Sequence, residues 1–164
     1  MVSNFGVGVE ENPVVTYNVD INQKRRIKNK MTSLIAIEGI GPKNAEKLAR
    51  AGIRSTESLL AKGGKAKVRK ALSAETGISD TQILEWVNRA DLFRIRGIGE
   101  EYSDLLEQAG VDTVVELAKR KAENLYTAMA DANAKKNLVN RLPSVNMVDD
   151  WIQIAKSLPR AVEY

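Results

Sequence analysis

Residues 37–46 read Ile37-Glu38-Gly39-Ile40-Gly41-Pro42-Lys43-Asn44-Ala45-Glu46, a glycine-hydrophobe-glycine turn between a short apolar run and an amphipathic segment. Gly39 and Gly41 permit backbone angles that are closed to other residues, and Ile40 between them can point inward as the chain reverses. Pro42 suits the first position of a helix, where its missing N–H costs nothing. Free amides at such a helix start attract anions, and Lys43 adds a positive charge. The stretch therefore predicts a helical hairpin with an anion site at its turn.

The same pattern returns 58 residues later in the chain. Eight positions are identical at that shift: Ile37/Ile95, Gly39/Gly97, Ile40/Ile98, Gly41/Gly99, Leu48/Leu106, Ala51/Ala109, Gly52/Gly110 and Leu59/Leu117. Farther along, residues 83–90 correspond to residues 148–155, and each of these segments contains a tryptophan. A repeat of this length indicates two similar units in tandem.

The two tryptophans, Trp86 and Trp151, admit two interpretations. An exposed indole can stack on a nucleic-acid base. Each tryptophan, however, lies at helical spacing from an apolar residue, Ile83 or Val148, and this favours burial in a core. We therefore expect both side chains to be buried.

The pattern from Met31 onward is helical throughout, with glycines at the ends of segments, and predicts an all-α protein of about ten short helices. The first of these helices spans about 32–38. Capping boxes are expected at Ser79/Gln82 and Thr113/Glu116, and Gly52 is expected to be a left-handed helix cap. We divide the helical part into units 31–92 and 93–164.

Each unit contains a further turn besides its glycine-hydrophobe-glycine turn. In the first unit this is Gly77-Ile78-Ser79, and in the second it is the stretch 142–146, which has no glycine. A single helical hairpin buries too little surface to be stable alone, so we expect the two hairpins of each unit to pack together.

These turns and the helices that follow them resemble the helix-hairpin-helix family. Residues 31–164 are similar to a bacterial family of unknown function that has the same doubled arrangement and closes each unit with a tryptophan helix. The resemblance implies two tandem repeats of paired helix-hairpin-helix motifs. It also implies that the protein holds the phosphate backbone of DNA without reading its bases.

The residues that match the family pattern at the first turn are Gly39, Ile40, Gly41 and Lys43, with Lys47 one turn further along the same helix. The nearest basic cluster is Lys65, Lys67, Arg69 and Lys70, on a helix expected to direct Val68, Ala71 and Leu72 inward. Turn geometry alone would also account for the two glycines, so both interpretations remain open at the first turn.

The second glycine turn carries the opposite charge. Glu100 and Glu101 stand where the first turn has Pro42 and Lys43. Carboxylates beside free amides repel a phosphate and instead stabilise the start of their own helix. At Gly97 and its partner glycine we therefore expect a structural role only.

The residue composition narrows the chemistry. The 164-residue chain has no cysteine and no histidine, which removes thiolate chemistry, the commonest general base and the commonest metal ligand. We expect no enzymatic activity, no cofactor and no metal. Glu100, Glu101 and Asp104 could hold a hard cation, but this cluster is interpreted as a solvated helix start.

Positive charge is concentrated in the first part of the chain. Residues 1–30 carry five basic and three acidic side chains, residues 31–90 ten and six, and residues 91–164 ten and twelve. Residues 1–30 lack helical periodicity and are predicted to be a disordered tail, whose basic run 24–30 can reach a neighbouring phosphate backbone. No apolar run has the roughly 18 residues that span a bilayer, and the first residues lack a signal-peptide pattern. We therefore expect a cytoplasmic protein that does not associate with a membrane.

Two functions remain. The first is non-catalytic, largely sequence-independent binding of nucleic acid, DNA rather than RNA, through phosphate contacts of the first hairpin. The second is a scaffold that binds a partner protein, with vestigial hairpins. No feature of the sequence indicates an oligomeric state.

Overall fold

The computed structural model describes residues 34–164, and this part of the chain contains helices and no strands. Eight helices follow one another: α2 (Pro42–Arg50), α3 (Thr56–Gly63), α4 (Ala66–Thr76), α5 (Asp80–Leu92), α6 (Glu100–Gln108), α7 (Val114–Leu117), α8 (Ala122–Lys136) and α9 (Val145–Ser157). The all-α prediction is confirmed. The predicted tail and its basic run 24–30 lie outside the described residues. None of the helices described combines the length and the hydrophobicity that crossing a bilayer requires.

Of the helix expected at about 32–38, residues 32 and 33 lie outside the described residues, Leu34 and Ile35 are helical, and residues 36–38 form turns and a bend. The N–H of Ile37 donates to the carbonyl of Leu34 at 3.1 Å, and the N–H of Ile40 donates to that of Ile37 at 3.0 Å. These three-residue steps form consecutive tight turns in place of a regular helix. Eight helices are described within residues 34–164, where about ten were predicted.

Side-chain caps fix where several helices begin. The hydroxyls of Ser79, Thr113 and Ser144 each accept a hydrogen bond from the amide three residues later. A reciprocal capping box forms at Ser55 and Ser58, where each hydroxyl accepts from the other residue's amide. At Thr113 the box is shifted by one residue, because Glu116 accepts from the amide of Asp112 at 3.3 Å. Gly52, with a φ of +78°, is the predicted left-handed residue after α2.

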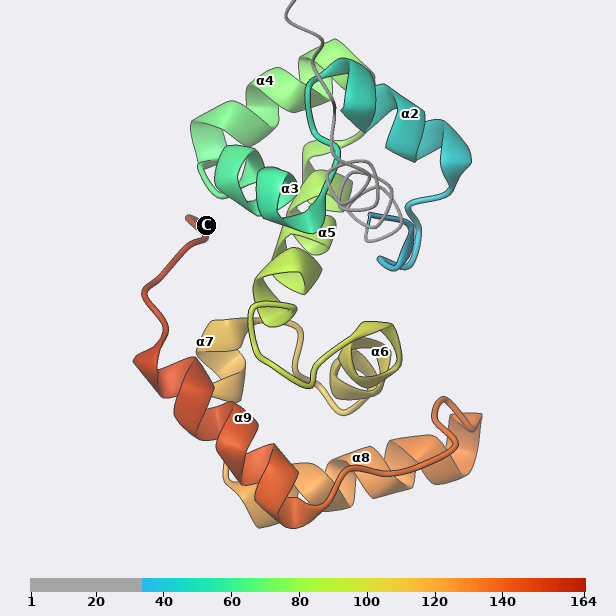
Figure 1. Cartoon of the computed structure of the whole chain (residues 1–164), viewed down its shortest axis with the longest axis vertical. Helices are drawn as coiled ribbons and strands as arrows, with labels where there is room; N and C mark the ends of the chain where they lie inside the picture. Colours follow the sequence, from blue (N-terminus) through green and yellow to red (C-terminus); the bar gives the residue numbers. More distant parts are fainter. Residues whose placement is uncertain (1–33) are drawn as a thin grey trace, which may run out of the picture.

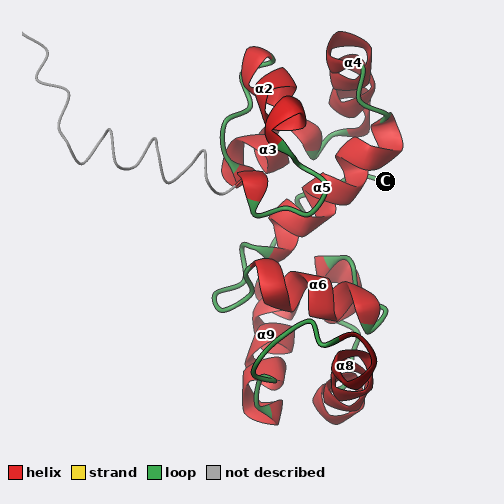
Figure 2. Ribbon diagram, turned by 90° about the vertical axis from the view of Figure 1, so that its right-hand side faces the viewer, coloured by secondary structure: helices red, strands yellow, loops and turns green. Residues whose placement is uncertain are grey.

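The buried apolar side chains form two cores. The first core contains buried residues from Leu34 to Ala90 together with Val162, and the second core contains buried residues from Leu92 to Ala155. Trp86 belongs to the first and Trp151 to the second, each only 2% exposed, so the prediction that both are buried is confirmed. Figure 1 and Figure 2 show α2–α5 gathered at one end of the molecule and α6–α9 at the other, with α5 leading from one group to the other.

The 58-residue repeat extends to backbone contacts. The hydrogen bonds from Ile37 to Leu34 and from Ile40 to Ile37 return between Ile95 and Leu92 and between Ile98 and Ile95. Long basic side chains at equivalent positions also close equivalent loops. The Nζ of Lys62 donates to the carbonyl of Ala51 at 3.0 Å, and Arg120 donates to that of Gly110 at 2.6 Å.

After α9 the chain returns to the first core. We call residues 159–164 the strap. Val162 is 2% exposed and buried among residues of the first core. Figure 1 shows the C-terminal end of the chain beside α3 and α5. The sequence-based grouping of residues 93–164 into one unit does not anticipate this crossing.

Candidate nucleic-acid interface

The structure requires glycine at one of the two glycine positions of the first turn but not at the other. Gly39 has a φ of +86°, and a Cβ placed there would lie 3.2 Å from Nε1 of Trp86. Its backbone conformation and the buried indole therefore both favour glycine. Gly41 has a φ of −74°, and nothing lies within 4 Å of a Cβ placed there. Neither the backbone nor the packing of the described chain requires Gly41 to be glycine.

The start of α2 presents free donors beside Gly41. Gly41 is the N-cap residue and makes no side-chain cap, and Pro42, which has no N–H, is the first helical residue. The first backbone bond of the helix is donated by Ala45 to the carbonyl of Gly41 at 3.0 Å, so the amides of Lys43 and Asn44 have no carbonyl partner among residues 34–164. The first turn of α2 contains no acidic residue. These amides can hold an anion.

Side chains around the first turn supply positive charge and hold the turn in place. Lys43 and Lys47 are exposed on α2, and helical spacing places them on the same face. Ile40 is 2% exposed in the first core and anchors the turn rather than contacting a ligand. The side-chain amide of Asn44 donates to the carbonyl of Gly39 at 3.2 Å and so links the helix start to the turn.

The second glycine turn has the same backbone but a different charge. Gly97 has a φ of +96°, and a Cβ there would lie 3.0 Å from Nε1 of Trp151. Gly99, like Gly41, has nothing within 4 Å of a Cβ placed on it. Here, however, Glu100 and Glu101 occupy the first turn of α6 and are exposed. Their carboxylates favour the helix start and oppose a phosphate at the same place.

The basic cluster predicted on α4 divides in the structure. Lys65, Lys67 and Lys70 are exposed, but Arg69 is 2% exposed. Its guanidinium donates to the carbonyls of Gly63 at 2.8 Å and Gly64 at 3.0 Å. Because these donors are already used inside the protein, Arg69 is not available to an external phosphate.

The inner face of α4 also differs from the expectation. Arg69 and Leu72 are its buried residues, whereas Val68 is half-buried and Ala71 is exposed. In Figure 1, α4 begins beside the end of α3, and α2 begins on the opposite side of this group of helices. The structure therefore does not bring the exposed lysines near the start of α4 together with Lys43.

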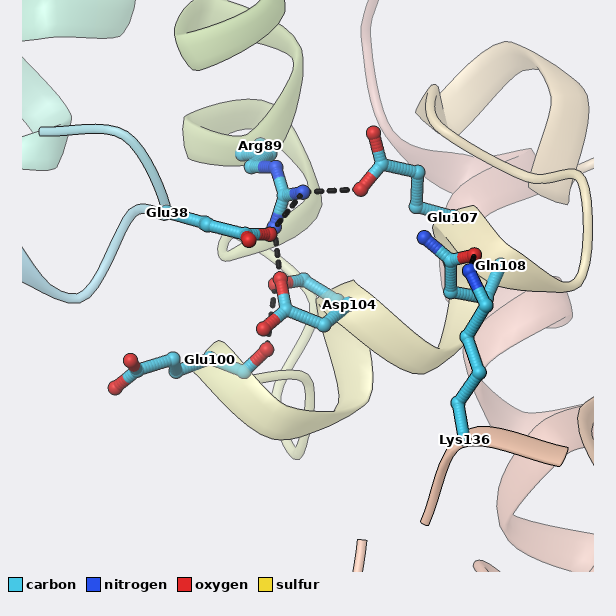
Figure 3. Close-up of polar contacts among 8 residues, drawn as sticks. Glu38, Arg89, Glu100, Asp104, Glu107, Gln108 and Lys136 are labelled. Carbon is cyan, nitrogen blue, oxygen red and sulfur yellow. Dashed lines mark hydrogen bonds and ion pairs between the residues drawn. The ribbon is translucent and has the colours of Figure 1, made fainter. Parts of the chain in front are cut away.

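An ion-pair network that no sequence pattern indicates lies beside the first turn (Figure 3). Arg89 of α5 donates to Asp104 and Glu107 of α6 and, at 3.3 Å, to Glu38, which precedes Gly39. One carboxylate oxygen from each of Glu38, Asp104 and Glu107 lies within 4.8 Å of the other two. The acidic cluster formed by folding is thus a different one from Glu100, Glu101 and Asp104, and Arg89 supplies its positive charge.

The Arg89 network connects the two groups of helices. Glu38 lies at the first turn, Arg89 in the last turn of α5, and Asp104 and Glu107 on α6 of the second group of helices. Glu38 and Arg89 are 51 residues apart in the chain. No local pattern relates such positions, so only the folded chain identifies them as partners.

Comparison with known proteins gives one match. A family model described as "Domain of unknown function (DUF4332)" matches residues 38–158. No curated protein and no solved structure matches the chain.

Proposed function

The chain belongs to the family described as Domain of unknown function (DUF4332), and we propose that it is a non-catalytic DNA-binding protein whose first glycine turn holds the phosphate backbone. On this proposal the chain consists of two tandem pairs of helix-hairpin-helix motifs. Of the two glycine-hydrophobe-glycine turns, only the first carries the positive charge that binding requires.

The observation that carries this proposal is the open space over Gly41 beside a helix start whose first turn contains no acidic residue, in contrast to Gly99. Nothing lies within 4 Å of a Cβ placed at Gly41, and its φ of −74° is open to any residue. The fold of the described chain therefore does not explain why this residue is glycine. Glycine at such a position suits the close approach of a ligand to the backbone. The free amides of Lys43 and Asn44 lie at the same helix start, where the helix dipole also favours an anion.

The composition of this surface suits a backbone contact rather than base reading. Its donors are main-chain amides and the exposed amines of Lys43 and Lys47, which bind phosphate without regard to sequence. Binding of this kind has a dissociation constant of roughly 10⁻⁴–10⁻⁶ M at physiological salt and weakens as salt rises.

Fluorescence anisotropy of a labelled DNA duplex over a salt series tests the proposal. The affinity is expected to fall steeply with salt, with a log–log slope of about −0.9 for each phosphate contacted. Lys43→Glu is expected to weaken binding about tenfold, because it removes a cation and places a carboxylate at the amides. Lys119→Glu, an equal charge change at an exposed site after α7, is the matched control and is expected to change affinity by less than about twofold.

The second turn provides the converse variant. Glu101 is equivalent to Lys43 and Glu100 to Pro42 at the 58-residue shift. Glu100→Pro combined with Glu101→Lys should raise affinity by creating a second cationic helix start. Equal weakening by Lys43→Glu and Lys119→Glu would show that attraction is diffuse and that the first turn is not the site.

A protein-interaction scaffold is the second candidate, and the exposed Glu100 and Glu101 at the second turn favour it, because they suit a basic protein partner rather than a nucleic acid. Absence of any salt-dependent binding to duplex DNA, with the chain folded, would replace the first proposal by this one.

A further inference from the structure

The strap lies in a groove of the first core that engages its main chain. The N–H of Glu163 donates to the carbonyl of Gly64 at 2.8 Å. The carbonyl of Glu163 accepts from the guanidinium of Arg69, which also holds the carbonyls of Gly63 and Gly64. Both main-chain polar groups of Glu163 are therefore bound by residues far earlier in the chain, while its side chain is exposed. Contacts of this kind bind a segment of chain whatever its side chain at that position.

Side-chain contacts on either side of Glu163 are selective. Val162 is 2% exposed in the first core. The hydroxyl of Tyr164 donates to Oδ1 of Asn88 at 3.1 Å, and Asn88 is itself buried on α5. Tyr164 is otherwise 58% exposed, so this hydrogen bond is what holds its side chain. The groove thus accepts a valine-sized apolar side chain, then any side chain, then one whose hydroxyl reaches Asn88.

Gly64 shows that the groove is shaped for a peptide main chain. Its φ of −59° and ψ of −32° are ordinary helical values that suit any residue. A Cβ at Gly64 would nevertheless lie 2.4 Å from the carbonyl oxygen of Ala161. The carbonyl oxygen of Leu60 would also lie 2.8 Å from this Cβ, so the strap provides the closer of two backbone contacts that exclude a side chain at Gly64.

The groove continues beyond the strap. A hollow of about 450 Å³ lies beside Ala161 and is lined by apolar residues that include Leu60, Ala90 and Phe93. Arg94 also borders it and donates to the carbonyl of Pro159 at 3.1 Å. The start of the strap is thus held by a second arginine, separately from Arg69.

We propose that this groove is a peptide-binding site, specific for a segment of the pattern valine-any-tyrosine, and that residues 161–164 of this chain are its resident ligand. Because the strap continues from α9, a peptide that displaces it also detaches the end of the second group of helices from the first core. The proposal does not depend on DNA binding.

The resident segment competes with any peptide added from outside. A ligand tethered by a short linker has an effective concentration on the order of 1 mM. The parent chain should therefore bind an added peptide weakly, and a variant with a weakened strap should bind the same peptide at least tenfold more tightly.

The test uses the full chain carrying Val162→Asp, which places a charge at the buried position of the strap. The probe is an acetylated and amidated peptide with the sequence of residues 158–164, titrated into the isotope-labelled chain and followed by amide NMR signals. The signals of Gly63, Gly64 and the side chain of Asn88 are expected to shift. A peptide with aspartate at the valine position should not bind, whereas one with glutamine at the glutamate position should bind equally well.

Two results would overturn the proposal: a folded Val162→Asp chain whose signals at Gly64 and Asn88 do not respond, or equal binding of the matching and aspartate peptides. If Val162→Asp loses its helical circular dichroism, the unmodified chain decides the question by amide hydrogen exchange. An excess of matching peptide, about 10 mM, should accelerate exchange at the amide of Glu163 several-fold relative to the aspartate peptide. Equal exchange with the two peptides would contradict a displaceable strap.

Discussion

Alanine substitutions at the two glycines of the first turn should have opposite consequences. Gly39→Ala forces a side chain into a left-handed conformation, which costs about 1–2 kcal/mol. The new methyl would also lie 3.2 Å from Nε1 of Trp86, whose indole is 2% exposed and has little room to move. With about 1 kcal/mol for this contact, we expect Gly39→Ala to lower the free energy of unfolding by about 2–3 kcal/mol.

Gly41→Ala should leave the stability nearly unchanged. The φ of −74° is open to alanine, and nothing lies within 4 Å of the added methyl group. Alanine is a poorer N-cap than glycine, but it also reduces the freedom of the unfolded chain by about 0.4–1 kcal/mol, and these effects oppose one another. On the proposed function, Gly41→Ala should instead weaken DNA binding, because the methyl group stands over the amides of Lys43 and Asn44.

Urea unfolding followed by tryptophan fluorescence measures this contrast. Gly97→Ala and Gly99→Ala are the matched pair in the second turn, with a φ of +96° and a 3.0 Å contact at the former and open space at the latter. Gly97→Ala and Gly39→Ala should be destabilised far more than Gly41→Ala and Gly99→Ala. The melting temperatures of the first two variants should fall by about 5–10 °C. Equal destabilisation by Gly39→Ala and Gly41→Ala would refute the assignment of separate roles.

Three further predictions concern the cores, the ion-pair network and the strap. Trp86→Ala and Trp151→Ala should each lower the free energy of unfolding by about 3–5 kcal/mol, and the parent chain should show blue-shifted emission that external quenchers hardly reach; red-shifted emission would contradict burial. Arg89→Met should lower the free energy of unfolding by about 1–3 kcal/mol at low salt and by less in 1 M salt, as measured by urea unfolding. A loss of stability that does not depend on salt would show that packing rather than charge is responsible. Burial, and then the nearby carboxylate of Asp91, raise the pKa of the Tyr164 phenol above its usual value of 10.0. As the pH rises, the phenol therefore ionises in a released strap before it ionises in a bound one, and release of the strap is favoured above about pH 10. Hydrogen exchange of the strap amides should show this release in the parent and much less of it in Tyr164→Phe.

The sequence by itself determined the helical class, the two glycine turns and the burial of both tryptophans. Each of these depends on residues that are near one another in the chain. The spacing of Ile83 and Trp86 places both on one face of a helix, and a glycine such as Gly39 relieves a backbone constraint at its own position. The repeat strengthened these predictions, because the same local signals occur twice in the sequence.

Charged residues were less predictable, because their environment depends on distant segments. Arg69 stands among lysines, yet it is buried because backbone carbonyls, one of them 94 residues away, accept its hydrogen bonds. Its spacing of three from Leu72 placed it on the buried face, and this was the one local signal of its position. The sequence-based assignment of Arg69 to a basic cluster with Lys65, Lys67 and Lys70 missed that signal.

Only the tertiary structure decided which side chains meet across the molecule. Glu38 and Arg89 become partners because the first turn packs near α5, and the strap reaches Gly64 because the chain after α9 runs back to the first core. Hydrogen bonds and ion pairs require donor and acceptor within about 3 Å, a condition that helical periodicity does not encode for residues in different elements. The periodic pattern specifies which face of each helix is buried, whereas the packing of those faces specifies the Arg89 network and the strap.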